Sequence, residues 1–238
     1  QAFDTLSDSQ QRIIGALAAL NGAPIHTEHL AALTGEANAQ VALQALSQRG
    51  LAQAHSPRYT LTGGLEQGLQ QAWDLEPWLE RALDHFTAWA EEHRQAPQRL
   101  LDDADAMLAI LAWAVKAGHW REVLRLGHAL EASLSLGKRW AAWEQVLNWL
   151  HEAGHRLGDQ AAEAWALHQL GTRDLCLGNA DAARSALSEA LELRQALGDR
   201  AGAAVTQHNL SLLAPPPATP PQEPPTTPKG RPPLPKWL

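Results

Sequence analysis

Two stretches of this sequence are near copies of each other: LGDQAAEAWALHQL at residues 157–170 and LGDRAGAAVTQHNL at residues 197–210. They are offset by 40 residues, and Leu130, Leu170 and Leu210 fall in the same register. Self-similarity at one fixed period is typical of stacked repeats, in which each unit buries its apolar face against its neighbours. We therefore predict an internal helical repeat over residues 104–213.

The clearest copy resembles a tetratricopeptide repeat (TPR) in the spacing of its small and apolar residues. These residues are Leu167, Leu170, Gly171, Gly178, Ala183, Leu187 and Ala190. Small residues at such positions let paired helices approach closely. The pattern predicts a helix over 160–177, a turn at Gly178-Asn179 and a return helix over 180–197, with a preceding pair over 120–157. Repeats of this kind form an α–α superhelix of TPR-like hairpins.

Residues 1–64 predict a winged-helix-like unit. Apolar periodicity and turn residues indicate helices over 8–20, 27–33 and 39–49, and strands over 51–54 and 58–61. The third helix is expected to place Val41, Leu43 and Leu46 inward. Three helices followed by a hairpin is the order of a winged helix.

Two further segments complete a mainly α fold. Residues 65–103 predict a connecting helical segment, in which Leu75, Leu79 and Leu83 recur at helical spacing. Residues 214–238 predict a disordered, proline-rich linker or tail, because eleven of the fifteen prolines lie there and little apolar surface remains to stabilise order.

Composition narrows the class of function. The formal net charge of -7 argues against a surface built as a whole for a phosphate backbone, since such binding depends on Lys and Arg. One cysteine, Cys176, cannot form an internal disulfide, and no run of apolar residues is long enough for a membrane span. We expect a cytoplasmic protein with no membrane segment in this chain and no nucleic acid as its partner.

The order of these units resembles the carboxy-terminal region of bacterial STAND proteins, the NB-ARC/NACHT-like signal-transduction ATPases with numerous domains. The phrases AWALHQLG at 164–171 and AVTQHNL at 204–210 are typical of their repeats. The resemblance implies that an upstream ATPase packs on the winged helix while the repeats sense a ligand or partner. No Gly-x-x-x-x-Gly-Lys-Ser/Thr loop occurs in these 238 residues, and Leu61-Thr62-Gly63 stands where many relatives have Leu-His-Asp. If the chain is a fragment, the nucleotide-binding domain is an upstream, intramolecular partner.

Three histidines recur at one position of successive first helices, and they lead to the candidate binding site. That position faces the concave groove of TPR arrays, so we predict a protein- or peptide-binding surface made by Arg125, His128, Trp165, His168, Thr172 and His208. The histidines cannot share one metal, because packed helices lie about 8–10 Å apart. A structural role in repeat packing is the alternative.

Trp140 and Trp143 follow Lys138-Arg139, and they form a second possible partner surface or, alternatively, part of the core. The tail sequence Arg231-Pro232-Pro233-Leu234-Pro235 resembles a polyproline ligand, with a spacer as the alternative.

The sequence allows two alternatives to a non-catalytic sensor. His151-Glu152-Ala153-Gly154-His155 matches the zinc-hydrolase pattern His-Glu-x-x-His, although the same segment falls on an ordinary return helix of the repeat. The winged-helix-like unit allows a DNA-binding regulator, although its third helix offers few cations. We expect no enzyme activity and no cofactor.

Overall fold

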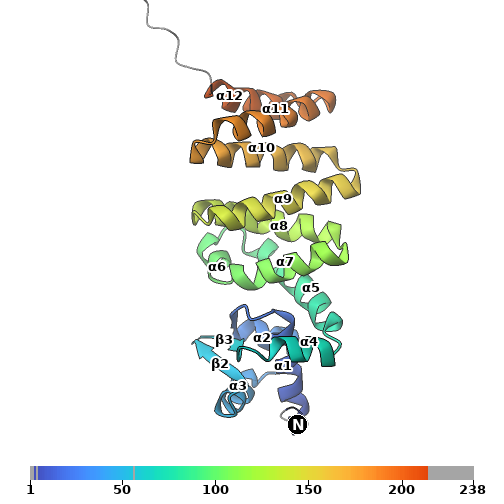
Figure 1. The fold of residues 1–238 in the computed structure, drawn as a ribbon, viewed down its shortest axis with the longest axis vertical. Coiled ribbons are helices and arrows are strands. Elements are labelled where there is room, and N and C mark those ends of the chain that lie inside the picture. Colours follow the sequence, from blue (N-terminus) through green and yellow to red (C-terminus); the bar gives the residue numbers. More distant parts are fainter. Residues whose placement is uncertain (1–2, 4, 56, 214–238) are drawn as a thin grey trace, which may run out of the picture.

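The computed structural model describes residues 3, 5–55 and 57–213 of the chain. Within these residues the fold is mainly α, with short strands only near the amino terminus, as predicted. Figure 1 shows the amino-terminal unit at one end of an elongated molecule and the later helices stacked above it up to the last helix. The predicted tail, 214–238, lies outside the described residues.

The amino-terminal unit has the predicted winged-helix-like order, with one additional strand. Its elements are α1 (Asp8–Ala19), β1 (Ile25–His26), α2 (Thr27–Thr34), α3 (Ala39–Gln48), β2 (Ala52–His55) and β3 (Arg58–Leu61). The strands form an antiparallel sheet in the order β1-β3-β2. A capping box between Ser7 and Gln10 starts α1, and Gly35 ends α2 in the left-handed conformation.

Two details of this unit differ from the sequence prediction. Strand β1 was not predicted, because two residues are too few to show an alternating pattern. Val41 was expected to point inward but is 65% exposed. The buried residues of α3 are Ala39, Leu43 and Leu46, whose spacing defines one face of the helix, and Val41 lies off that face.

Four helices lead from this unit into the repeats: α4 (Glu66–Ala72), α5 (Glu76–Glu92), α6 (Pro97–Asp102) and α7 (Ala104–Ala117). Helix α5 packs on α1 and α2 of the amino-terminal unit and also on α7 and α8 of the stack. It is therefore shared by both parts of the molecule.

The stack continues through α8 (Trp120–Leu136), α9 (Trp140–Leu157), α10 (Gln160–Leu177), α11 (Ala180–Ala196) and α12 (Arg200–Ser211). Each of these helices packs on the next one in the chain. The helical pairs predicted over 120–157 and 160–197 are thus confirmed, with the second pair ending one residue earlier than expected. Gly158 and Gly178 adopt the positive φ angles that let the chain reverse after α9 and α10.

The 40-residue register extends one unit further toward the amino terminus than the sequence comparison indicated. Phe86, Leu126, Ala166 and Thr206 are spaced by 40 residues on α5, α8, α10 and α12, and each is 0% exposed. Helix α5 therefore holds the position of a first repeat helix, with α7 as its packing partner.

Close contact between paired helices depends on two buried glycines. A Cβ atom on Gly127 would lie 2.7 Å from Leu150 Cδ2, and one on Gly171 would lie 2.5 Å from Leu187 Cγ. Both distances are far below van der Waals contact, so the leucine of the second helix fills the space that a side chain would need.

Replacing Gly171 with alanine tests this packing. Alanine is the better helix former by about 1 kcal/mol, yet we expect Gly171→Ala to lower the free energy of unfolding by about 1–3 kcal/mol because it overpacks the contact with Leu187. Gly68→Ala in α4 is the matched control, since nothing lies within 4 Å of its added Cβ. Urea denaturation should show it unchanged or stabilised; equal effects of both substitutions would contradict the packing argument.

Candidate functional site

The predicted groove residues lie on the first helices of successive repeats, but several already contact one another. Arg125 makes a two-pronged ion pair with Glu91 of α5, at 3.0 and 2.7 Å. The rings of His128 and Trp165 pack edge to face, with their centroids 4.3 Å apart. Burial lowers the pKa of His128, and the charge of Arg94 adds to this effect. His128 therefore favours the neutral ring that such packing accommodates.

His168 lies within the helix packing rather than on an open groove. Its exposure is 8%, and its Nδ1 atom lies 3.2 Å from the hydroxyl oxygen of Thr206. Burial, and then the charge of Arg194, lower the pKa of His168 to about 4. The Thr172 hydroxyl donates to the His168 carbonyl oxygen and accepts a bond from the Asn209 side chain. His168 and Thr172 thus join α10 to α12.

The last member of the set, His208, is exposed on α12. The three repeated histidines therefore occupy three different environments: packed on tryptophan, buried against threonine, and open to solvent. Equal spacing in the sequence does not give them one common role.

Trp165 also borders a hollow of about 450 Å³ at the start of α10. The hollow, which we call the Trp165 hollow, is lined by Ala161, Ala164, Trp165, Arg194, Leu197, Gly198 and Asp199. Leu197 is 44% exposed, and Val205, one repeat beyond Trp165, is 53% exposed. An aromatic wall with an exposed aliphatic side chain, that of Leu197, beside it can accept an apolar side chain of a partner.

The two tryptophans of the second predicted surface are not equally accessible. Trp143 is 3% exposed and donates its indole N–H to Glu131 at 3.1 Å, so it belongs to the core and not to an exposed surface. This corrects the interpretation of Trp143 as a surface residue. Burial raises the pKa of Glu131, against the effect of this hydrogen bond. Trp140 is half-buried and packs against Trp143.

The zinc-hydrolase pattern lies on α9, and two of its three polar side chains, Glu152 and His155, are already paired. Glu152 forms an ion pair with Arg156 at 2.7 Å, and His155 Nδ1 lies 2.9 Å from Glu163. Across residues 3, 5–55 and 57–213 no three His, Cys, Asp or Glu side chains are placed to hold one metal ion. In the same part of the chain no helix is both long and apolar enough to cross a membrane.

The arginines of the amino-terminal unit are also engaged. Arg12 pairs with Glu36, Arg49 bonds the Thr5 hydroxyl, and Arg58 binds Asp103. Helix α3 itself contains no Lys or Arg that could contact a phosphate backbone. The DNA-binding alternative gains no support from this arrangement.

A buried polar cluster connects the amino-terminal unit to the stack, and no sequence pattern predicts it. Asp103, 6% exposed at the start of α7, accepts hydrogen bonds from Arg58 at 2.9 and 3.2 Å and lies 3.3 Å from His29. Burial alone raises the pKa of Asp103, but the hydrogen bonds and charge interactions with His29 and Arg58 lower it below its ordinary value. His29 Nδ1 also lies 2.9 Å from His85 Nε2. We call these four residues the junction cluster.

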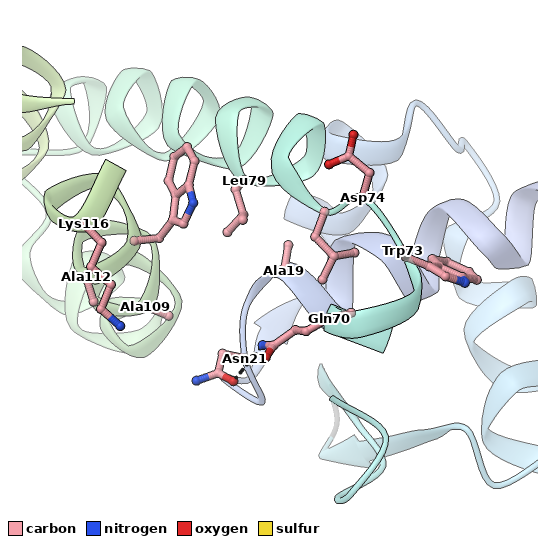
Figure 2. A pocket seen from close by; sticks show the side chains of 12 residues that line it. Ala19, Asn21, Gln70, Trp73, Asp74, Leu79, Ala109, Ala112 and Lys116 are labelled. Carbon is pink, nitrogen blue, oxygen red and sulfur yellow. Dashed lines mark hydrogen bonds between the residues drawn. The ribbon is translucent and has the colours of Figure 1, made fainter. Parts of the chain in front are cut away.

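A cleft of about 520 Å³ lies between the same two parts of the molecule (Figure 2). Ala109, Ala112 and Lys116 line it from α7, and Asn21 and Gln70 meet on the opposite side, where a hydrogen bond of 3.2 Å joins their amides. The remaining lining residues are Ala18, Ala19, Trp73, Asp74, Leu75, Leu79 and Trp113. We call this the junction cleft.

Sequence patterns predicted the elements that line the junction cleft but not the cleft itself. In the sequence, Asn21-Gly22 is typical of a helix-ending turn, and Trp113 lies in an apolar helical pattern that predicts a core position. The one signal in the sequence is that Ala109 and Ala112 place small side chains beside Trp113 on a single helix face. Without knowing that α1 faces α7, that pattern does not distinguish a cleft from a tight contact.

No protein-family model and no curated protein matches this chain. Among solved structures, the chain is similar to the crystal structure of a Signal Transduction ATPase with Numerous Domains (STAND) protein with a tetratricopeptide repeat sensor from Pyrococcus horikoshii. The match has a TM-score of 0.30 and 15% sequence identity, and it covers 89% of this chain and 48% of that chain. The chain thus spans about half the length of that protein.

The buried state of His168 predicts a pH dependence of stability. Its folded pKa of about 4 lies below the ordinary value of 6.5, so between these values the unfolded chain binds a proton that the folded chain does not. The free energy of unfolding should therefore fall as the pH drops from about 6.5 to about 4, by up to about 3 kcal/mol from this group. Urea titrations of His168→Gln across this range should show a weaker dependence, and His155→Gln, at a histidine whose side chain is 73% exposed, is the control. Parallel curves for the wild type and His168→Gln would refute the assignment.

The junction cluster predicts a large difference between two neighbouring aspartates. Asp103→Asn leaves Arg58 and the buried His29 without a carboxylate, so we expect a loss of about 3–5 kcal/mol in the free energy of unfolding. Asp105→Asn removes an exposed ion pair with Arg139 and should cost about 0–1 kcal/mol. Similar losses in chemical denaturation would show that the cluster does not hold the two parts together.

Proposed function

We propose that this chain is a non-catalytic regulatory module that binds a partner protein through its helical repeats. The observation that carries the proposal is the Trp165 hollow, where Trp165 and the exposed Leu197 line the same opening on the repeats. Interface anchors are enriched in aromatic residues that sit in or beside pockets. The occupant we propose is a peptide segment of a protein that inserts one apolar side chain.

Charged groups around the hollow support a peptide as the occupant. Asp199 lines the hollow and is the amino-terminal cap of α12, and Arg200 follows it. A main-chain amide or carbonyl of a peptide could bond such groups while its side chain fills the hollow. Buried Arg194, held by the Gly202 carbonyl and the Thr206 hydroxyl, forms a fixed part of the wall.

The proposal places the chain in a larger signalling protein of the STAND kind. The connection between the two parts of the molecule supports this. Helix α5 and the junction cluster join the winged-helix-like unit to the repeat array, so a partner bound to the repeats could change how the two parts pack against each other. An upstream nucleotide-binding domain would be the element that responds, and a cytoplasmic location would follow. Gain or loss of a partner on the array would then change the state of the ATPase.

Selection from a displayed library of random peptides on the full chain tests the binding surface. Trp165→Ala and Leu197→Ser should weaken the selected peptides by about tenfold or more, because each removes apolar contact area at the hollow. Calorimetry or fluorescence polarisation with a labelled peptide gives the dissociation constants.

Leu136→Ser is the matched control, since Leu136 is 70% exposed at the end of α8 but the alternating helix directions place it at the opposite edge of the stack. It should leave affinity within about twofold of the wild type. Failure to select any peptide, or selected peptides that lose as much affinity with Leu136→Ser as with Leu197→Ser, would overturn the proposal.

A further inference from the structure

The junction cleft has the size and walls of a small-molecule site. Ala18 and Ala19 on α1 and Ala109 and Ala112 on α7 contribute little volume, and about 520 Å³ stays open between the helices. Ligand pockets in proteins span about 300–1,000 Å³ and have mostly apolar walls with a few polar groups. The volume of the cleft lies in that range, and its lining combines alanine, leucine and tryptophan side chains with the polar Asn21, Gln70, Asp74 and Lys116.

One side of the cleft is suited to a flat ring. Trp113 lines the cleft together with Leu79, and its indole packs on His119 with centroids 5.0 Å apart at an angle of 32°. Contact with His119 restricts the orientation of the indole. A fixed aromatic side chain beside small residues favours a planar ligand, because rings stack with little loss of side-chain freedom.

The polar groups of the cleft select the chemistry of the ligand. The Gln70 amide donates to Asn21 Oδ1, which leaves the Gln70 oxygen as an acceptor and the Asn21 nitrogen as a donor. Lys116 makes no hydrogen bond or ion pair within the described residues, whereas the Asp74 carboxylate already accepts the Glu76 backbone N–H. The Asp74 carboxylate keeps its negative charge, so the group in this lining that can pair with an anionic ligand is the ammonium of Lys116.

We propose that the junction cleft binds a small aromatic carboxylate that carries a hydrogen-bond donor on its ring. The ring lies against Trp113, the donor meets the Gln70 oxygen, and the carboxylate pairs with Lys116. Such a ligand touches α1 and α4 on one side and α7 on the other, so it bridges the amino-terminal unit and the stack (Figure 2). This site is separate from the Trp165 hollow and does not depend on the proposed function.

Calorimetric titration of the full chain with two probes tests the site. Indole-3-acetate has a ring, an N–H donor and a carboxylate, and indole-3-acetamide has the same ring and donor without the charge. We expect one molecule of indole-3-acetate to bind per chain. Lys116→Gln should weaken it by about tenfold and change the binding of indole-3-acetamide by less than about threefold.

A second variant tests the location of the site. Ala112→Phe fills the space between the helices and should abolish binding of both probes, with circular dichroism used to check that it folds and Ala109→Leu as its replacement if it does not. Leu197→Ser should leave the binding of both probes unchanged, which separates this site from the Trp165 hollow. No heat of binding from either probe, or binding that survives a folded cleft-filling variant, overturns the proposal.

Discussion

Each helix of this molecule is stable only because a neighbour covers its apolar face. Stacked two-helix units share this constraint, since a single unit cannot bury its own surface. The fully buried positions of α5, α8 and α10 show it directly, because each of these helices packs between its own partner helix and a neighbouring unit. The first unit of the stack has no earlier repeat to cover it, and α1 and α2 of the amino-terminal unit pack against α5 in its place.

Because the amino-terminal unit takes the place of an earlier repeat, both the buried junction cluster and the junction cleft lie where that unit meets the stack. The amino-terminal unit is a different shape from a repeat, so its fit against the stack is tight at α5 and at the start of α7, and open beside Ala109, Ala112 and Lys116 further along α7. Where the fit is tight, Asp103 is buried and needs His29 and Arg58 as partners. Where it is open, the junction cleft remains. Both features follow from joining two unlike surfaces.

Local sequence patterns predicted the elements well, and the contacts between distant elements poorly. The register of Leu157-Gly158-Asp159 with Leu197-Gly198-Asp199 was enough to place α10 and α12, because a helix period and its stop signals are local properties. The environment of His168 was not predictable in the same way, since it depends on Thr206 and Arg194 of later helices. The burial of Trp143 also depends on another helix: Glu131, on α8, accepts the hydrogen bond of the Trp143 indole N–H.

The residues at the equivalent buried positions also change systematically along the chain. From α5 to α10 the apolar side chain at this point of the core becomes smaller, from Phe86 through Leu126 to Ala166, and on α12 Thr206 places a hydroxyl there that accepts a hydrogen bond from Arg194. In a molecule whose units contact only their neighbours, cohesion follows such local differences. Among the described helices we therefore expect α12 to open more readily than α5, so that the two ends of the described stack differ in their local stability.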